Sequence, residues 1–574
     1  MIGDSAPSDG AEVSPDDLAV SALFAVVPPE QLAECAARAR LATFRRGDLL
    51  AREGDPEDDL LVLLSGTVEV VIERAGREEF IGVLGRGDIV GDLALLLERE
   101  RTATVRALRD CSAARVGAED FSWLLNTAPT FAAKLARTIA THLERTTHRI
   151  ARARPVGSVA VVALEEDVAV EASALRAGLA AALPAAAAPE SGAIEVLSHD
   201  GAGDSDPPAV LAEGDHSLIR QADVVLAVGR TATPAALARL SHLADLASAA
   251  QPSTRLELVV LQRGDGPYDG TASWLGDERV NDWHHLPSRS GDVAVARLAR
   301  RLAGTAVGVV LSGGGARAFA HIGVLRALRE AGIAVDVIGG ASMGAIVAAQ
   351  HAAGMTPDEM VARMRAAFVG ARGLPDFTLP LVALRTGAGT QRRLTAMFGE
   401  LRSEDLATTF VCVSSNLVTA ESVVHDRGPV WLAVRTSATV PGMLPPMRAG
   451  RDALLVDGGL LENLPVAAVR ERHAGRIIAS DASVRLIPQT PVEAPRRRRP
   501  RLPGRHAGMP RIDAILMRTV ELASVRDSRE AGQPADLYLA PRVDDVAMNQ
   551  FARIDELVDR GYEAAREALD GWAP

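Results

Sequence analysis

Three different patterns of apolar and polar residues follow one another along the chain. Between residues 19 and about 125, short alternating apolar runs such as Leu60–Leu64, Val68–Ile72 and Thr104–Leu108 are separated by glycine turns. An alternation of period two with a turn roughly every ten residues predicts a small β-barrel or β-sandwich. A helix is predicted directly after it, because apolar residues recur there at helical spacing: Phe131, Leu135, Ile139, Leu143 and Ile150.

Strands and helices alternate in the rest of the chain. From residue 155 to about 303, apolar runs such as Val159–Leu164 alternate with helical patterns such as Pro234–Ala250, which predicts a parallel, Rossmann-like α/β sheet. A third α/β pattern begins at Val307, and the Pro- and Arg-rich segment Thr490–Pro510 interrupts it. We therefore expect four parts: a disordered tail over 1–18, a β-rich domain with its helix over 19–154, an α/β linker domain over 155–303, and a further α/β domain over 304–574.

The composition is typical of a globular protein and argues against nucleic acid as a partner. Of its 574 residues, 48% are apolar and 24% are charged, which is typical of folded domains. The net charge of −12 gives no overall electrostatic footprint for nucleic acid. Cys35, Cys111 and Cys412 are too widely spaced for a disulfide framework or a cysteine metal cluster. The acidic N-terminus is unlike a signal peptide, and the apolar stretches are shorter than the ~18 residues that span a bilayer, so we expect a cytoplasmic protein.

Two glycine-rich turns in the third region each lie between a strand and a helix. The strand Val307–Leu311 is followed by Ser312-Gly313-Gly314-Gly315-Ala316-Arg317, where uncovered backbone N–H groups at the start of a helix suit an anion. The strand Val335–Gly339 leads into Gly340-Ala341-Ser342-Met343-Gly344 and the helix Ala345–Ala353. This is a G-x-S-x-G motif in the strand–turn–helix setting that exposes a serine nucleophile.

A serine hydroxyl needs a base before it can act as a nucleophile. His321 lies within the helix that follows the first glycine-rich turn and faces Val324 and Leu325, so we interpret it as a packing residue. Asp457 is the better candidate, because it ends the strand Ala453–Val456 and precedes two glycines. The alternative is that both residues, the serine and the aspartate, serve only as turn residues.

These three features, in their order and spacing, resemble the patatin-like phospholipase family. The matching segments are Gly313–Arg317, Gly340–Gly344 and Asp457–Gly459. The resemblance implies a Ser342–Asp457 dyad without histidine that hydrolyses lipid acyl esters, an oxyanion hole of N–H groups around Gly314 and Gly315, and no required cofactor or metal. Two other functions stay open: a binding protein whose hydrolase domain is idle, and an acyltransferase that uses the same nucleophile.

The β-rich region contains Gly91-Asp92-Leu93-Ala94-Leu95-Leu96 and, shortly after, Arg101-Thr102. This segment resembles the phosphate-binding cassette of cyclic-nucleotide-binding domains. The resemblance implies cAMP or cGMP as an effector, held by backbone N–H groups, the Arg101 guanidinium and the Thr102 hydroxyl. Asp92 stands where that family commonly has the longer glutamate. The alternative is therefore a domain that has this fold but binds no cyclic nucleotide. The helix that follows implies a homodimer, with packing on its own barrel as the alternative.

The order of the three domains carries a wider resemblance. The first strand of the linker domain runs into Glu165-Glu166-Asp167, whose carboxylates would repel phosphate, so we expect a structural or coupling role. With Trp283-His284-His285-Leu286 ahead of the third domain, the chain resembles the neuropathy target esterase group, which implies phospholipid or lysophospholipid substrates. Six arginines, Arg496–Arg499, Arg501 and Arg505, predict a solvated loop or docking to a membrane surface as a peripheral protein. The stretch Leu374–Leu384 is a candidate access flap.

Overall fold

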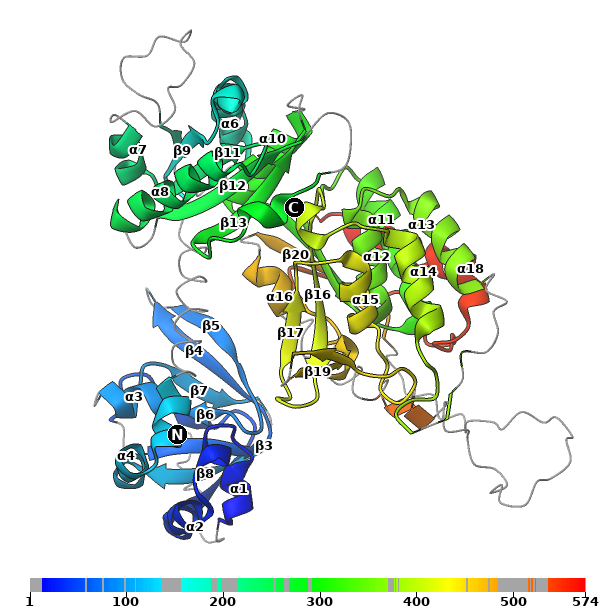
Figure 1. Cartoon of the computed structure of the whole chain (residues 1–574). Coiled ribbons are helices and arrows are strands. Elements are labelled where there is room, and N and C mark those ends of the chain that lie inside the picture. Colours follow the sequence, from blue (N-terminus) through cyan, green and yellow to red (C-terminus); the bar gives the residue numbers. More distant parts are fainter. Residues whose placement is uncertain are drawn as a thin grey trace, which may run out of the picture. The chain divides into compact units, whose positions relative to one another are not determined.

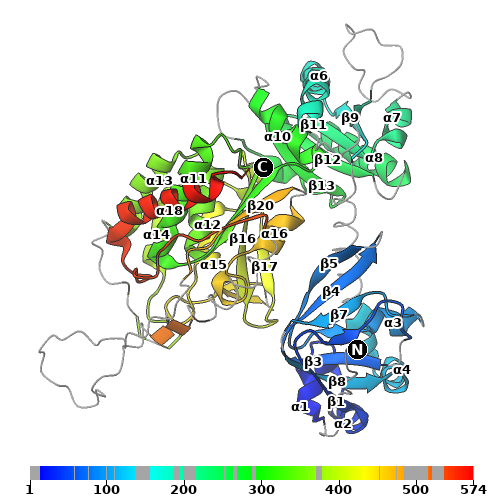
Figure 2. The same ribbon diagram turned by 180° about the vertical axis from the view of Figure 1, so that it is seen from behind.

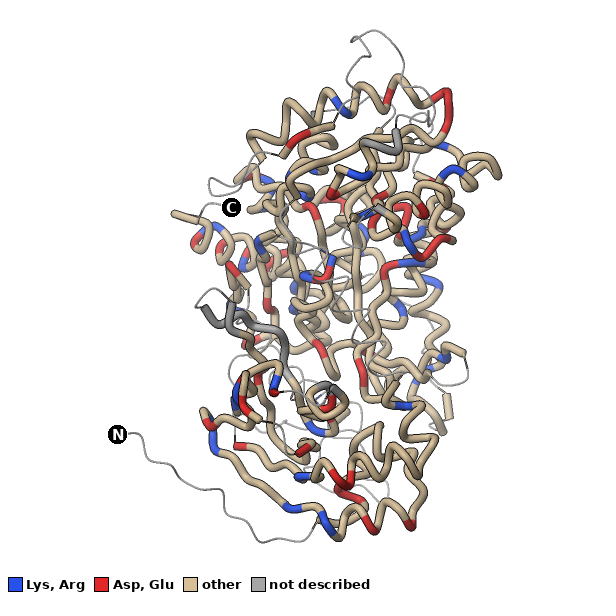
Figure 3. The backbone as a smooth tube through the Cα atoms, turned by 90° about the vertical axis from the view of Figure 1, so that its left-hand side faces the viewer, with Lys and Arg blue, Asp and Glu red and all other residues tan. Residues whose placement is uncertain are grey.

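The computed structural model describes residues 13–56, 59–74, 77–97, 100–108, 110–136, 156–186, 194–197, 215–250, 254–262, 268–287, 292–369, 376, 378–379, 381–450, 453–472, 475–483, 515–516, 518–519, 522 and 535–572. The chain divides into two compact units, Met1–His148 and Arg149–Pro574, which are treated separately. Figure 1 shows their elements in chain order from blue to red. In Figure 3, acidic and basic residues are interspersed along the described chain.

The first unit contains two antiparallel four-stranded sheets, ordered β1-β8-β3-β6 and β2-β7-β4-β5. Leu61 and Leu63 point into the core between the sheets, whereas Leu60 and Val62 pack against the helices. The predicted β-barrel is therefore confirmed, with β3 buried on both of its faces. The elements are α1 (Pro15–Ala19), α2 (Pro29–Arg38), β1 (Arg40–Phe44), β2 (Leu49–Ala51), β3 (Asp59–Ser65), β4 (Val68–Arg74), β5 (Arg77–Leu84), β6 (Ile89–Val90), α3 (Asp92–Leu97), β7 (Thr104–Ala107), β8 (Cys111–Gly117) and α4 (Ala118–Thr127).

The N-terminal segment differs from the predicted disordered tail over 1–18. Residues 1–12 lie outside the described residues, but Pro15–Ala19 forms α1. The hydroxyl of Ser14 accepts a hydrogen bond from the N–H of Asp17, and the Asp17 carboxylate accepts one from the N–H of Ser14, which is a capping box. Leu18 is fully buried in the core of the unit. The prediction was therefore wrong for the last residues of the tail, because capping and burial of one leucine fix them.

The helix predicted after the barrel is described only over residues 129–136. Phe131 is buried and makes edge-to-face contacts with Phe24 and Phe121, with ring centroids 5.3 and 5.9 Å apart. Leu135 is buried in the same core. The start of the helix thus packs on its own barrel. Residues 137–150, which would carry the expected dimer contacts, lie outside the described residues, so the homodimer stays a prediction.

The linker domain is a parallel five-stranded sheet in the order β10-β9-β11-β12-β13. The helices α6 and α10 pack on one face and α7, α8 and α9 on the other, as in the predicted Rossmann-like layering. Glu166–Ala186, which contains α6, is long and apolar enough to pass a composition test for a membrane span, but its leucines also pack against the sheet. The elements are β9 (Ser158–Ala163), α6 (Ala169–Ala186), β10 (Glu195–Val196), α7 (Asp215–Gln221), β11 (Val224–Gly229), α8 (Pro234–Ala250), β12 (Arg255–Leu261), α9 (Thr271–Trp274), β13 (Val280–Leu286) and α10 (Asp292–Ala303).

The third domain is built on a mixed sheet in the order β18-β19-β16-β15-β14-β20-β21, with β17 also paired to β16. Strands β16, β15, β14, β20 and β21 are parallel, whereas β17 and β19 each pair antiparallel with β16, and β18 pairs antiparallel with β19. The strands are β14 (Val307–Leu311), β15 (Val337–Ala341), β16 (Thr409–Asn416), β17 (Ser422–His425), β18 (Met447–Ala449), β19 (Ala453–Asp457), β20 (Arg476–Ser480) and β21 (Leu537–Leu539).

Helices cover both faces of this sheet, as Figures 1 and 2 show from opposite sides. Helices α11, α12, α13, α14, α15 and α18 build the large core on one face, and α16 packs on the other. The helices are α11 (Ala320–Glu330), α12 (Ser342–Ala352), α13 (Pro357–Met364), α14 (Ala388–Phe398), α15 (Val430–Ser437), α16 (Val466–Glu471) and α18 (Ile554–Leu569). Because parallel strands end at a common edge, the segments after β14 and β15 lie side by side.

Charged hydrogen bonds join the linker domain to the third domain. Arg300 in α10 binds the fully buried Asp336 through two bonds of 2.6 and 3.0 Å. Arg301 donates to Asp282 in β13 and to Thr409 at the start of β16. Bidentate, charge-assisted bonds of this kind fix orientation as well as distance. The two domains are therefore held together by specific contacts in addition to the chain that links them.

Candidate active site

The candidate nucleophile Ser342 lies at the turn between β15 and α12. Its φ angle is +53°, which is the left-handed region that residues other than glycine seldom adopt. The backbone N–H of Ser342 donates to the hydroxyl of Ser437 at 2.9 Å. Strand β15 ends at Ala341 and α12 begins at Ser342 itself, so the elements start and end a few residues away from the predicted boundaries. The strained turn predicted for the G-x-S-x-G motif is present.

The glycines of this turn allow two chain segments to approach closely. A Cβ atom on Gly344 would lie 2.3 Å from the carbonyl oxygen of Ser312, and one on Gly340 would lie 2.8 Å from that of Leu311. Both distances are shorter than any van der Waals contact. Hydrogen at these two positions therefore lets the start of α12 pack against the end of β14, next to the first glycine-rich turn. Met343 lies between these glycines and is buried.

Asp457 meets Ser342 from the end of β19. Its Oδ2 atom accepts a hydrogen bond of 2.7 Å from Oγ of Ser342, and its Oδ1 accepts one of 2.9 Å from the N–H of Gly459. The backbone N–H of Asp457 donates to the carbonyl of Thr439 at 2.8 Å. Burial raises the pKa of Asp457 to about 6, although the two bonds to its carboxylate act in the opposite direction. A carboxyl with this pKa can take up and release a proton near neutral pH.

The first glycine-rich turn passes directly beside the nucleophile, since a Cβ on Gly313 would lie 3.1 Å from that of Ser342. Three of its N–H groups are engaged: Gly313 donates to Asn463, Ala316 to Met548, and Arg317 to Gly314. For the N–H groups of Gly314 and Gly315, the described part of the chain offers no hydrogen-bond acceptor. These are the two groups around which the family resemblance implies an oxyanion hole.

His321 is hydrogen-bonded to Ser312 and Ser480 and does not contact Ser342. One ring nitrogen, Nε2, is 2.9 Å from the carbonyl oxygen of Ser312, and Nδ1 is 2.8 Å from the hydroxyl of Ser480. Burial lowers the pKa of His321 to about 4, so the ring is neutral at pH 7. The carbonyl can only accept, so Nε2 carries the proton and Nδ1 accepts from Ser480. This confirms the interpretation of His321 as a packing residue.

Several supporting residues were not found from the sequence. Ser437, Thr439 and Asn463 position the turn, the aspartate and the glycine-rich loop, respectively. All three lie at least 95 residues from Ser342 in the sequence. Their roles depend on tertiary contacts, and the sequence carried no local signal for them.

In the first unit, the predicted nucleotide-binding residues all lie in the segment between β6 and β7. Gly91 has a φ of +100° and precedes Asp92, the first residue of α3; nothing is described of the Leu93 side chain. The guanidinium of Arg101 is nearly buried and donates to the carboxylate and the backbone carbonyl of Asp59 at 2.9 and 3.1 Å. Thr102 is exposed. Sequence reasoning missed Asp59 as the partner of Arg101.

Other predicted features fall partly or wholly outside the described residues. The six arginines of 496–505 are outside, as are Pro375, Phe377 and Pro380 of the candidate flap. In the linker domain, Glu165 accepts hydrogen bonds from the N–H groups of Arg230 and Thr231 at 2.7 and 3.1 Å. This carboxylate therefore occupies the place after β11 where a phosphate would bind in a nucleotide-binding sheet.

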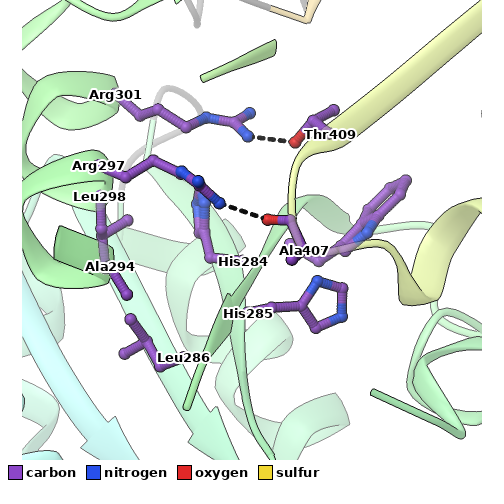
Figure 4. Close-up of a pocket in the computed structure, with 10 residues that line it drawn as sticks. His284, His285, Leu286, Ala294, Arg297, Leu298, Arg301, Ala407 and Thr409 are labelled. Carbon is purple, nitrogen blue, oxygen red and sulfur yellow. Dashed lines mark hydrogen bonds between the residues drawn. The ribbon is translucent and has the colours of Figure 1, made fainter. Parts of the chain in front are cut away.

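A shallow pocket lies where the linker domain meets the third domain (Figure 4). Arg297 donates to the carbonyl of Ala407 at 2.6 Å, and Arg301 donates to the hydroxyl of Thr409. His284 is bonded to Glu257 at 2.8 Å, and burial lowers the pKa of His285 to about 3. The two arginines of this pocket are thus used in contacts between the domains, whereas His284 is paired within the linker domain.

Comparison with known families assigns two parts of the chain. Residues 309–470 match the model of the patatin-like phospholipases, and residues 41–128 match that of the cyclic nucleotide-binding domain. The first range contains both Ser342 and Asp457, and the second contains the segment from Gly91 to Thr102. The third domain is thus a patatin-like phospholipase domain, which makes the chain a lipid ester hydrolase by class. The first is a cyclic nucleotide-binding domain, and both predicted folds are confirmed.

Relatives that match most of this chain identify the particular family. An uncharacterized NTE family protein of Mycobacterium tuberculosis is 30% identical over 566 residues, covering 95% of each chain. Lysophospholipase NTE1 of Mycosarcoma maydis is 27% identical over 92% of this chain and 33% of its own length. Human patatin-like phospholipase domain-containing protein 6 is 27% identical over 92% of this chain and 44% of its own length. The chain belongs to the NTE family.

Proposed function

We propose that the chain hydrolyses acyl esters of phospholipids and lysophospholipids with a dyad of Ser342 and Asp457. The observation that supports this most directly is the hydrogen bond of 2.7 Å from Oγ of Ser342 to the buried carboxylate of Asp457. The serine is held in a strained turn, and the aspartate has a pKa near 6. A nucleophile paired with a base of matched pKa is the arrangement that acyl transfer requires.

In the first half of the reaction, Oγ of Ser342 bonds to the carbonyl carbon of the ester as its proton passes to Oδ2 of Asp457. The N–H groups of Gly314 and Gly315 stabilise the resulting oxyanion, and each such donor contributes about 3 kcal/mol in comparable sites. The intermediate then collapses and the bond to the alcohol breaks. The departing alkoxide takes the proton from Asp457, which leaves the acyl group on the serine.

Water completes the cycle in the second half. Asp457 accepts a proton from a water molecule whose oxygen attacks the acyl carbon, and the same N–H groups hold the oxyanion. When the bond to Oγ breaks, Ser342 recovers the proton from Asp457 and the fatty acid is released. The substrate class follows the relatives, one of which is named a lysophospholipase.

A panel of phospholipids and lysophospholipids, with product analysis, tests this function. Wild type is expected to release fatty acid, whereas Ser342→Ala and Asp457→Asn release it only at the rate without enzyme. Ser273→Ala, an exposed serine in α9, is the matched control and is expected to retain activity. A fluorophosphonate probe is expected to label wild type and the control but not Ser342→Ala. Full activity in Ser342→Ala would reject the dyad, and acylated acceptors in place of fatty acid would indicate a transferase.

We also propose that the cyclic nucleotide-binding domain takes cAMP or cGMP as an effector. Two observations support this proposal: residues 41–128 match the cyclic nucleotide-binding domain, and the guanidinium of Arg101 lies nearly buried in the segment between β6 and β7. A guanidinium can bind a phosphate through two parallel hydrogen bonds. Calorimetric titration is expected to show heat with one of the two nucleotides and none in Arg101→Ala. No heat with wild type at millimolar ligand would reject the proposal. A cytoplasmic location stays a prediction.

A further inference from the structure

Six exposed large apolar side chains of the third domain lie on three segments near the dyad. They are Leu379, Leu381, Val382, Leu417, Val418 and Leu461, which we call the apolar rim. Leu381 is 89% exposed, and Leu379 and Val382 are 77% and 70% exposed. Single exposed leucines need no explanation, but several on separate segments around one place mark an interaction surface.

Strand register places two of these segments beyond the nucleophile. Val413 in β16 pairs with Ala341, the residue before Ser342, and Ser414 pairs with Asp457. Strand β16 continues to Asn416, so Leu417 and Val418 follow on the outer side of the site. Leu461 comes four residues after Asp457. All three therefore lie at the edge where the dyad is found.

Hydrogen bonds place the third segment, residues 378–385, at the same edge. The N–H of Leu384 donates to the carbonyl of Gly442 at 2.8 Å, and that of Arg385 donates to Met443 at 3.1 Å. The turn over 440–444 directly follows Thr439, whose carbonyl accepts the N–H of Asp457. The loop that carries Leu379, Leu381 and Val382 is thus bonded to the turn over 440–444, and this turn directly follows the residue that is bonded to Asp457.

We propose that the apolar rim inserts into the hydrocarbon surface of a phospholipid membrane and places Ser342 over its substrate. This proposal rests on the proposed function. The occupant is inferred from composition, because the rim contains only leucine and valine. Protein-binding surfaces gain most of their affinity from tryptophan, tyrosine and arginine, and leucine and valine are under-represented there. The rim also lies at the edge of the sheet where the dyad is found, and an acyl chain must leave the bilayer to reach Ser342.

The full-length chain and vesicles of pure phosphatidylcholine test this proposal. The variant Leu379→Glu/Leu381→Glu changes two exposed side chains of the rim. Val170→Glu/Val293→Glu is the matched control, because these valines are 70% and 76% exposed on the linker domain. Each protein is measured by sedimentation with vesicles, by hydrolysis of vesicle lipid and by hydrolysis of a soluble short-chain ester. A second rim variant, Val418→Glu, covers a different segment.

The rim variants are expected to lose sedimentation with vesicles, and their ratio of vesicle to soluble-ester hydrolysis is expected to fall at least about tenfold, which corresponds to 1.4 kcal/mol. The control is expected to behave as wild type. Sedimentation of the rim variants at the level of the control would overturn the proposal, whatever the hydrolysis shows. If wild type hydrolyses no ester but sediments through the rim, the proposed function fails and the docking surface stands.

Discussion

Replacing Asp457 with asparagine is expected to make the protein more stable while it removes hydrolysis. Burial raises the pKa of this carboxyl from 3.8 to about 6, and the opposing hydrogen bonds from Ser342 and Gly459 are already contained in that value. Between these two pH values the folded chain binds a proton that the unfolded chain has released. The free energy of unfolding contributed by Asp457 therefore falls as the pH rises from about 4 to about 6.

The size of the effect follows from the interval between the two pKa values. An interval from 3.8 to about 6 corresponds to about 3 kcal/mol of stability lost once the carboxylate is fully charged. Asparagine has the same shape and never carries the charge, so the variant avoids this loss. The gain in stability is therefore about 3 kcal/mol at pH 8 and disappears near pH 4.

Thermal unfolding followed at pH values from 4 to 8 measures this gain. The melting temperature of Asp457→Asn is expected to exceed that of wild type by a few degrees at pH 8 and to converge with it near pH 4. Asp358→Asn is the control for the loss of one negative charge, because the Asp358 side chain is 89% exposed. A difference that does not change with pH, or a variant less stable than wild type at pH 8, would refute the reasoning.

Three further outcomes follow from the same site. Hydrolysis of a soluble ester is expected to rise with pH and level off above about 6, because Asp457 accepts a proton only as the carboxylate; a flat rate from pH 5 to 8 would contradict this role. Ser437→Ala is expected to lower kcat about tenfold with little change in KM, since the strained turn at Ser342 loses the acceptor of its N–H; an unchanged kcat would count against it. Gly344→Ala is expected to lower the melting temperature and abolish fluorophosphonate labelling, because its Cβ would overlap the carbonyl of Ser312; normal labelling would argue against this close contact.

The catalytic residues of the site could be predicted from the sequence because glycines lie close to both of them in the chain. A turn that exposes Ser342, and the glycines that follow Asp457, leave a pattern that is readable without coordinates. The sequence also contains the signals for the helix start at Ser14, since Ser14 and Asp17 form a capping box and Pro15 stands at the first helical position. These features are local, so a short stretch of sequence determines them.

Features that depend on distant segments could not be predicted. The strand β15 begins two residues later than expected, since the side chain of Asp336 binds the N–H of Val307 and the guanidinium of Arg300. Likewise, nothing near Arg101 in the sequence indicates that Asp59 contacts its guanidinium. Such pairings are decided by packing between elements and leave no periodic pattern.

The bond between Arg300 and Asp336 sets the smallest portion of the chain that could work alone. Asp336 is fully buried, and its carboxylate is paired with the guanidinium of Arg300 in α10, the helix that precedes β14 in the chain. A fragment cut at residue 304 would enclose a carboxylate without its counter-charge, which is strongly destabilising. The hydrolase domain and the Rossmann-like linker domain are therefore expected to fold and unfold as a single unit.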